Sequence, residues 1–366
     1  MSKLGIYVHI PFCVGKCPYC DFYSVTSDCE QRERFVRALT DDIKENADKR
    51  YIVDSIYFGG GTPTTLSEKQ LDSIMKAVKS SFVVSEDVEI TIEANPCTVG
   101  EISFKGLRSI GFNRISFGVQ SCVDDELRAL GRLHSFAQAE SCVRAACNAG
   151  FENISCDLML GIIGQDIGSL KYSVDTLCSW PITHISAYML SIEQGTPYDN
   201  DAVRSAIASE DMVADMYLYA VNRLNNNGFE QYEISNFCRG GKYSRHNMKY
   251  WSREDYIGFG PSAHSFRNGK RYYYERDIEK YITDRKSILK IEDAYCNVLE
   301  EYVMLSLRTC IGMDISKYIE YGGNEQKVSA LANELVKHGL AKNDGSHLKL
   351  TPKGFLVSNS IMTELM

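Results

Sequence analysis

Short apolar runs alternate with longer amphipathic stretches along roughly the first 195 residues of the chain. The apolar runs are rich in Ile, Val, Tyr and Phe and end in Gly, Pro or polar residues, as buried strands do. They are LGIYVHI, SIYFGGG, DVEITIEANP, FNRISFGVQ, ISCDLMLG and HISAYML. The stretches between them have the apolar spacing of helices, which are predicted at residues 29–47, 67–80, 100–110, 135–149 and 167–180.

The alternation of six strands with helices also predicts how these elements pack. A strand followed by a helix and a further strand favours a parallel sheet with helices over its outer face. A closed barrel of eight such units needs about 250 residues. The sequence therefore predicts an α/β fold with a partial (β/α)6 barrel over residues 1–198. Functional residues are expected at the carboxyl ends of the strands.

Two further parts of the chain follow the predicted barrel. Residues 199–290 show less clear periodicity and concentrate aromatic and polar residues in YEISNF, SRHNMKYWS and YIGFGPSAHSF, so we interpret them as a connector that closes over the barrel mouth. Residues 291–366 combine helical spacing in YVMLSLRT and VSALANELVKHGL with a turn signal at Asp344-Gly345. Helices followed by a hairpin predict a small winged-helix-like module.

The charge balance limits what these parts can bind. The chain has 40 Lys and Arg against 48 Asp and Glu, a net charge of −8, and no basic block. Because a chain with this charge balance is unsuited to binding nucleic acid, the carboxyl-terminal module is interpreted as a lid or packing domain. No apolar run reaches the roughly 20 residues that cross a bilayer, and the first residues lack the features of a secretory signal. A cytoplasmic protein without a transmembrane segment is expected.

Three of the thirteen cysteines lie within eight positions. Cys13, Cys17 and Cys20 form a C-x3-C-x2-C motif after the first strand, and clustered thiols in a reducing compartment indicate metal binding. Three thiolates can bind three irons of a 4Fe-4S cluster and leave the fourth iron open. The alternative is zinc, which needs four ligands; His9 is a candidate, but on an extended strand it would lie about 12 Å or more from Cys13. Cys29 and the other cysteines are interpreted as packing residues.

The motif and its surroundings resemble a known family. C-x3-C-x2-C with Tyr19 before the third cysteine is similar to the signature of radical S-adenosylmethionine (SAM) proteins. The run YVHIPFCVGKCPYCDF, with GGGTPT, EANP, GVQS, DLMLG, ISAY and GFGPSAHS further along, resembles the oxygen-independent coproporphyrinogen oxidase branch over nearly the whole chain. Within that branch the chain is most similar to HemW-type heme chaperones. Phe22 stands where the oxidases have a further cysteine, the amino terminus is shorter, and RHNMKYW contains an HNxxYW element.

The resemblance implies a SAM site at the ends of the strands. In this family the loop that corresponds to residues 59–63 (GGGTP, the glycine loop) contacts the SAM amino group, and Glu93 matches the residue that pairs with the ammonium. Arg132 would pair with the SAM carboxylate as a bidentate fork, and Gln120 and Asp157 would lie beside the ribose. The implied SAM-binding residues are Tyr7, Tyr19, Gly60, Gly61, Thr62, Glu93, Gln120, Arg132, Asp157 and Ala187. Without the resemblance, a strand-end turn, a helix cap or a surface ion pair would be the ordinary explanation.

The HNxxYW element, His246, Asn247, Tyr250 and Trp251, is implied to bind heme. In a helix, His246 and Tyr250 would share one face, and Asn247 and Trp251 another. Histidine and tyrosine can be axial ligands of heme iron, and an indole ring offers a flat apolar surface for a porphyrin. The alternative, which stays open, is an aromatic and hydrogen-bonded plug in the barrel mouth. His264 in GPSAHS has the same two interpretations.

Together these features imply a heme chaperone that binds a 4Fe-4S cluster, SAM and heme and delivers heme to apo-hemoproteins such as respiratory enzymes. An electron donor would be a further partner if SAM is cleaved. The rival hypothesis is an enzyme that decarboxylates two propionates of coproporphyrinogen III through a 5′-deoxyadenosyl radical. Phe22 argues against it, because the thiol at that position is tied to oxidase activity in the family. A different radical SAM reaction on a tetrapyrrole is the third hypothesis.

Overall fold

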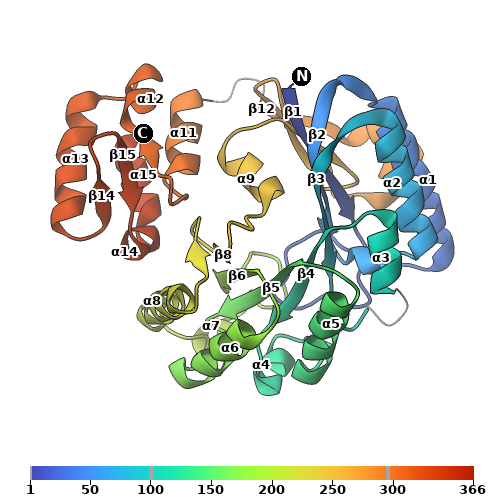
Figure 1. Cartoon of the computed structure of the whole chain (residues 1–366), viewed down its shortest axis with the longest axis horizontal. Coiled ribbons are helices and arrows are strands. Elements are labelled where there is room, and N and C mark those ends of the chain that lie inside the picture. The colour runs from blue at the N-terminus through green and yellow to red at the C-terminus, as the bar shows by residue number, and fades with distance from the viewer. Residues whose placement is uncertain (1, 99–102, 294–296) are drawn as a thin grey trace.

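The computed structural model describes residues 2–98, 103–293 and 297–366. A strongly curved sheet forms its centre, helices lie along the convex side, and a separate group of helices and short strands lies at one end of the molecule (Figure 1). Six strands of the sheet are parallel and follow one another in chain order. They are β1 (Ser2–Ile10), β2 (Asp48–Gly60), β3 (Phe82–Ala94), β4 (Arg114–Gln120), β5 (Asn153–Leu160) and β6 (His184–Met189).

Helices connect these strands in the predicted order. They are α1 (Cys29–Glu45) after β1, α2 (Glu68–Ser81) after β2, α3 (Phe104–Ile110) after β3, α4 (Asp124–Ala129) and α5 (Phe136–Asn148) after β4, and α6 (Ile167–Ser179) after β5. The sequence analysis did not predict α4. For the other helices the predicted bounds agree to within two residues, except for the third predicted helix, whose residues 100–102 lie outside the described residues. The parallel (β/α) arrangement inferred from hydrophobic spacing is therefore confirmed.

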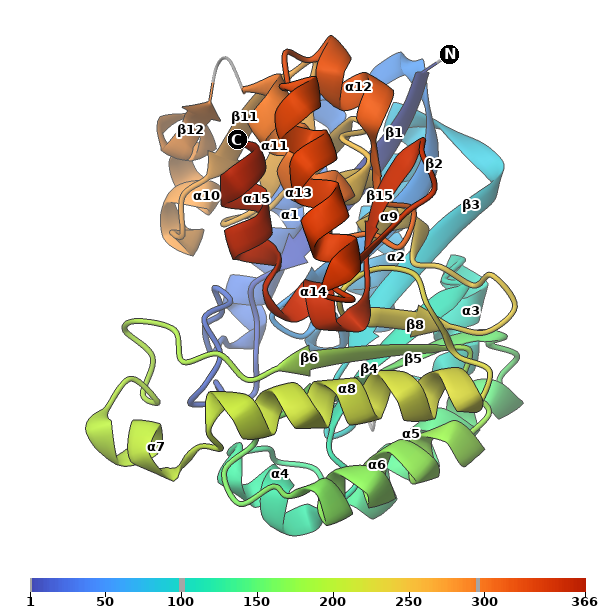
Figure 2. The same ribbon diagram turned by 90° about the vertical axis from the view of Figure 1, so that its left-hand side faces the viewer.

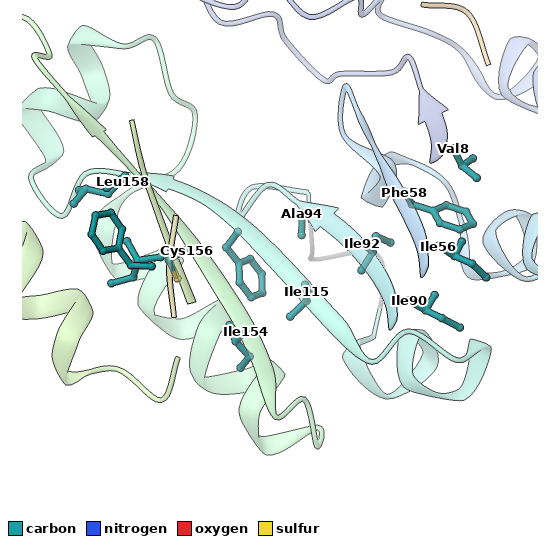
Figure 3. Packing of buried hydrophobic residues seen from close by; sticks show 14 of the residues in the cluster. Val8, Ile56, Phe58, Ile90, Ile92, Ala94, Ile115, Ile154, Cys156 and Leu158 are labelled. Carbon is teal, nitrogen blue, oxygen red and sulfur yellow. The ribbon is translucent and has the colours of Figure 1, made fainter. Parts of the chain in front are cut away.

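Side chains alternate between two very different faces of the sheet. Apolar residues such as Val8, Ile92 and Leu158 belong to the buried hydrophobic core that the sheet forms with the helices (Figure 3). The residues between them point to the concave side, because successive side chains of a strand alternate. Those on the concave side that line a cavity include Tyr57, Glu93, Ser116, Asp157 and Ser186. Each strand thus buries an apolar face and presents a polar one.

Residues 199–290 extend the same sheet at both edges. Beside β6 lie β8 (Asn236–Cys238) and β7 (Glu230–Gln231), and beyond β1 lie β9 (Tyr256–Phe259), β10 (His264–Arg267), β11 (Lys270–Tyr274) and β12 (Leu289–Asp293). The helices of this part are α7 (Asp201–Ala206), α8 (Glu210–Asn226), α9 (Arg245–Trp251), α10 (Ile278–Asp284) and a 3-10 helix at Arg285–Ile288. Strands this short show no readable period, whereas α8 does have an amphipathic pattern, which the sequence analysis missed. The boundaries at 198 and 290 stay predictions.

The last segment combines helices with a hairpin, as predicted. Its elements are α11 (Val298–Ser306), β13 (Met313–Asp314), α12 (Ile315–Glu320), α13 (Glu325–Lys337), β14 (Ala341–Asn343), β15 (His347–Leu350), α14 (Pro352–Leu356) and α15 (Ser358–Leu365). Two backbone hydrogen bonds join it to the larger part of the molecule: Ile234 N–H donates to Arg308, and Cys310 N–H donates to Tyr232. In Figure 2 this group faces the viewer, in front of part of the sheet. In the described part of the chain no helix is long and apolar enough to span a membrane.

The alternation on β6 can be tested with two neighbouring residues. Ile185 is fully buried in the core, so Ile185→Ala should lower the free energy of unfolding by about 2–5 kcal/mol. Ser186 lines the cavity, and its hydroxyl makes no hydrogen bond to other described residues, so Ser186→Ala should change stability by less than about 0.5 kcal/mol. Urea unfolding measures both values, and equal losses would contradict the assignment of the two faces.

Candidate functional site

The cysteine motif lies on a loop that begins where β1 ends. This loop is fastened near its start, because Cys13 N–H donates to the Val25 carbonyl at 3.0 Å. Cys20 N–H donates to the Cys17 carbonyl at 3.1 Å and closes a turn with Pro18 at its second position, where proline is favoured. All three thiols are half-buried and line the same cavity. Local turn chemistry therefore gathers the motif on one wall of that cavity.

The glycine loop after β2 packs directly against the cysteine loop. Thr62 N–H donates to the Phe12 carbonyl at 2.7 Å. A Cβ on Gly61 would lie 2.7 Å from that same carbonyl oxygen, closer than side chains come to backbone. Gly60 has a φ of 108°, and a Cβ there would lie 2.5 Å from the His9 ring. The protein's own packing therefore requires glycine at both positions, whether or not a ligand approaches them.

The two loops and the strand ends enclose a cavity of about 590 Å³, a usual size for a small-molecule site. The predicted site residues that line it are Cys13, Cys17, Cys20, Tyr19, Gly60, Gly61, Thr62, Glu93, Gln120, Arg132, Asp157 and Asn247. The fold thus gathers residues from distant parts of the chain at the carboxyl ends of its parallel strands.

Glu93, near the end of β3, is held by two donors from β2. The Tyr57 hydroxyl donates to Oε1 at 2.7 Å, and the Gly60 N–H donates to Oε2 at 3.2 Å. Burial raises the pKa of the Glu93 carboxyl, although both hydrogen bonds lower it. Because both donors are neutral, the carboxylate can still gain from a cationic partner in the cavity.

Arg132 reaches from the loop after α4 to the cysteine loop. One Nη donates to the Gly118 carbonyl at 2.6 Å, and the other lies 3.6 Å from Cys17 Sγ. Its Nε is buried and has no hydrogen-bond partner among the described residues. An unpaired buried donor is costly, so this guanidinium is suited to an anionic group in the cavity.

Gln120 and Asp157 occupy unusual environments in β4 and β5. Gln120 has a φ of 69°, a left-handed conformation that is strained for a residue with a Cβ, and its Oε1 accepts a hydrogen bond from Tyr188. The pKa of Asp157 is raised to about 7, mainly by burial and secondly by the neighbouring Glu93 carboxyl. Two arginines and a serine hydroxyl oppose this shift. Strained backbone and shifted carboxyls are typical of functional sites.

Two residues of the implied SAM site, Tyr7 and Ala187, are not among the residues that line the cavity, and their contact with SAM stays a prediction. Ala187 is 1% exposed and belongs to the hydrophobic core, because it points outward between the inward-pointing Ser186 and Tyr188. Tyr7 points inward, but its hydroxyl lies 3.1 Å from His9 Nδ1 and its ring stacks on a side chain of α9. Tyr7 therefore supports the cavity wall from behind.

The HNxxYW element forms α9, a helix on the concave side of the sheet (Figure 1). His246 is fully buried: its Nδ1 is hydrogen-bonded to the Ser55 hydroxyl at 3.0 Å and its Nε2 to the Tyr250 hydroxyl at 2.9 Å. Burial, helped by nearby positive charge, lowers its pKa to about 3. Both ring nitrogens are engaged, as in the plug alternative, whereas Asn247 and Trp251 are half-exposed.

Other candidate ligands lie outside the cavity. His264 is exposed on β10, with Nδ1 3.4 Å from a Glu292 carboxylate oxygen. His9, the zinc candidate, has both ring nitrogens engaged, Nε2 with the Tyr23 carbonyl at 3.0 Å. Within the described ranges, no three His, Cys, Asp or Glu side chains are grouped to hold a single metal ion. Cys29 is exposed at the start of α1, so its interpretation as a packing residue is wrong.

The inner part of the cavity is lined by polar residues that the sequence analysis did not single out. They are Arg114, Ser116, Ser155, His184, Ser186 and Asn236. The His184 ring joins two of the surrounding elements, since its nitrogens lie 2.7 Å from the Ser155 and Tyr232 hydroxyls. Polar residues at alternate positions of β4, β5 and β6 are the signal that could have found this lining.

Comparisons with known proteins agree with this arrangement. Residues 7–177 match the model of the radical SAM superfamily, and residues 297–357 match that of the HemN C-terminal domain. The heme chaperone HemW of Bacillus subtilis is 34% identical over 97% of both chains. That of Lactococcus lactis is 31% identical over 98% of this chain and 96% of its own. The chain belongs to the HemW family of radical SAM proteins.

This HemW-family chain also has the fold of a solved radical SAM enzyme. Coproporphyrinogen III oxidase (HemN) from Escherichia coli has a TM-score of 0.83 and 22% sequence identity, over 99% of this chain and 90% of the oxidase. At this level of identity the likeness shows the fold alone. It confirms the predicted radical SAM architecture, with the partial barrel followed by the carboxyl-terminal module.

The pKa of Asp157 predicts a pH-dependent stability of the HemW-family protein without cluster or SAM. Because its folded-state pKa is about 7 and its unfolded-state pKa is lower, folding retains the proton, and this contribution to stability is lost as pH rises towards 7. The difference in the free energy of unfolding between Asp157→Asn and the parent should therefore rise, in favour of the variant, by about 3 kcal/mol from about pH 4.5 to about pH 7.5. Urea unfolding at both pH values measures this gain. The exposed Asp211→Asn is the control, and a gain in Asp157→Asn that is independent of pH would contradict the assignment.

Proposed function

We propose that this protein is a cytoplasmic heme chaperone that holds a 4Fe-4S cluster and SAM in its cavity, binds heme, and delivers it to apo-hemoproteins. The observation that carries the proposal is the extent of the similarity to the Bacillus subtilis heme chaperone, which covers 97% of both chains. The similarity therefore includes α9 and the carboxyl-terminal module as well as the SAM cavity.

The cluster is proposed to bind through Cys13, Cys17 and Cys20, one iron to each thiolate, with the fourth iron open to SAM. Two polar groups already approach these sulfurs: the Thr62 hydroxyl lies 3.5 Å from Cys13 Sγ, and the Arg132 guanidinium lies 3.6 Å from Cys17 Sγ. Groups hydrogen-bonded to the sulfur ligands orient them toward the metal. When bound, the cluster supplies an electron that can cleave the sulfonium of SAM.

SAM is proposed to lie between Glu93 and Arg132, its ammonium against the carboxylate and its carboxylate against the guanidinium. The unpartnered Nε of Arg132 and the neutral donors on Glu93 support this orientation. Gln120 and Asp157, on the two following strands, are proposed to lie beside the ribose. Opposite charges on the two sides of one cavity would orient a zwitterionic amino acid.

Heme is proposed to bind at α9. Asn247, Tyr250 and Trp251 of the HNxxYW element are half-exposed and offer the first contact, while His246 is fully buried. The imidazole can bind iron only after one of its two hydrogen bonds, to Ser55 or to Tyr250, has broken, since both ring nitrogens are engaged. Because His246 is fully buried, ligation also requires the side chains around it to move.

Phe22 favours the chaperone over a coproporphyrinogen oxidase. Its side chain is 68% exposed and lines the cavity beside the cysteine loop. A phenyl ring has no S–H group to donate or lose a hydrogen atom, in contrast to the cysteine expected there in the oxidases. The protein is therefore proposed to lack that activity, although it has the oxidase fold.

The first test of the proposal concerns the cluster. Anaerobic reconstitution of the full chain should yield a 4Fe-4S cluster, because the three thiols line one cavity wall. Replacing Cys13, Cys17 or Cys20 by Ala should abolish its absorption and its paramagnetic signal after reduction. Cys29→Ala, which replaces an exposed cysteine outside the motif, is the control and should retain the cluster. Zinc bound in place of iron would overturn the assignment.

The second test concerns heme. If His246 binds the iron, His246→Ala should shift the Soret band while heme affinity falls less than about tenfold, since burial of the porphyrin does not depend on the ligand. Trp251→Ala should mainly weaken binding. Titration with heme, followed by absorption, measures both effects. His264→Ala, which changes an exposed residue of β10, is the matched control, and a Soret shift in that variant alone would place the iron there instead.

The same preparation separates the chaperone from the enzyme. With cluster, SAM and reductant present, it should not convert coproporphyrinogen III to protoporphyrinogen. Turnover of coproporphyrinogen would favour the oxidase hypothesis over the proposed function.

A further inference from the structure

Arg114, the first residue of β4, is a buried cation that the proposed SAM site does not use. The residue is 2% exposed, and it lines the inner part of the cavity. It alternates with Ile115, which lies in the hydrophobic core, so its side chain is on the concave side of the sheet. In the register of the sheet Arg114 is opposite Thr91, two residues before Glu93 on β3.

The guanidinium of Arg114 has no partner within the described residues. It makes no ion pair or side-chain hydrogen bond there, and its Nε is buried and unsatisfied. A buried charge without a partner is strongly unfavourable, and proteins almost always pair such a group. A group that completes this site is therefore expected to come from outside the chain.

The nearby carboxylates have other partners. Glu89 accepts hydrogen bonds from the backbone N–H groups of Arg245 and His246 at the start of α9. Glu93 accepts from β2, and Asp157 is hydrogen-bonded to a serine hydroxyl. Arg114 exerts an electrostatic effect on Glu93 and Asp157, but neither forms an ion pair with it.

The other residues around Arg114 are neutral and polar. His184 is buried, which holds its pKa well below the usual value, and both of its nitrogens are hydrogen-bonded. The Asn236 side chain is hydrogen-bonded to Glu233, which leaves its Oδ1 buried and unsatisfied on the cavity wall. An unpaired cation and an unpaired acceptor that line the same cavity are suited to a ligand that carries an anionic group and a donor.

We propose that Arg114 binds a carboxylate of a second ligand that shares the cavity with SAM. The planar guanidinium matches a carboxylate through two parallel hydrogen bonds. A cavity of about 590 Å³ that also takes SAM has room for a small carboxylate or the carboxylate arm of a larger molecule, but not for a whole macrocycle. The two sources are a propionate side chain of heme and a free dicarboxylate. The proposal rests on the proposed function in one respect, because it takes SAM to occupy the outer part of the cavity.

The test uses the full chain with cluster and SAM, as parent, Arg114→Gln and the exposed control Arg128→Gln. One arm compares the affinities for heme and heme dimethyl ester, which lacks free carboxylates. A second arm measures the shift of the melting temperature in succinate. A third compares SAM with decarboxylated SAM in the parent, in Arg114→Gln and in Arg132→Gln. Melting of the ligand-free variants shows whether Arg114 has a structural role.

The parent and the control should bind heme at least about tenfold more tightly than heme dimethyl ester, and Arg114→Gln should bind heme and the ester with equal affinity. A succinate shift that Arg114→Gln removes, with no preference for heme over its ester, would support the free dicarboxylate as the source. Ligand-free Arg114→Gln should melt no lower than the parent, because it removes an unpaired charge.

Three results would overturn the proposal. The first is that neither the ester preference nor the succinate shift depends on Arg114. The second is that Arg114→Gln, rather than Arg132→Gln, removes the preference for SAM over its decarboxylated analogue, which would assign Arg114 to the carboxylate of SAM itself. The third is a lower melting temperature of ligand-free Arg114→Gln. A parent that binds no heme would contradict the proposed function instead, and the succinate arm alone would then decide the role of Arg114.

Discussion

The sheet can bury only one of its faces against helices, and the rest of the structure depends on which side chains occupy that face. In β3, Ile92 belongs to the core and Glu93 to the cavity; in β5, the same holds for Cys156 and Asp157. A slip of one residue in the register would exchange the two faces, placing carboxylates in the core and hydrocarbon in the cavity. The core therefore fixes the cavity, and one alternating pattern encodes both.

Two loops complete the site on this scaffold, and they depend on each other. The glycine loop can lie against the cysteine loop because Gly60 and Gly61 have no Cβ to collide with His9 and Phe12. The cysteine loop in turn is held to the sheet by His9, whose ring Nε2 is hydrogen-bonded to the Tyr23 carbonyl. A loop that must hold three thiolates thus takes its shape from backbone contacts rather than from a helix or strand of its own.

Sequence periodicity predicted the parallel strands and their helices because each strand is long enough to show its pattern. The cavity residues that belong to motifs, such as Glu93 and Arg132, were found through the family resemblance, since a single acidic or basic residue has no pattern. Arg114 was missed for the same reason, as a lone charge in an apolar strand. The outward direction of the Ala187 side chain follows from the alternation within β6, which the sequence analysis did not apply to it. The burial of His246 depends on contacts with other strands, which spacing along the chain does not reveal.

In the proposed site the alternating sheet and the two loops hold SAM at an open iron of a cluster bound by three cysteines. Electron–nuclear double resonance of the reduced, cluster-loaded protein tests this most directly, with SAM isotopically labelled at its amino nitrogen and carboxylate oxygens. Both labelled groups should couple to the cluster. If SAM binds to saturation and neither label couples, SAM lies away from the iron, and the proposed site is wrong.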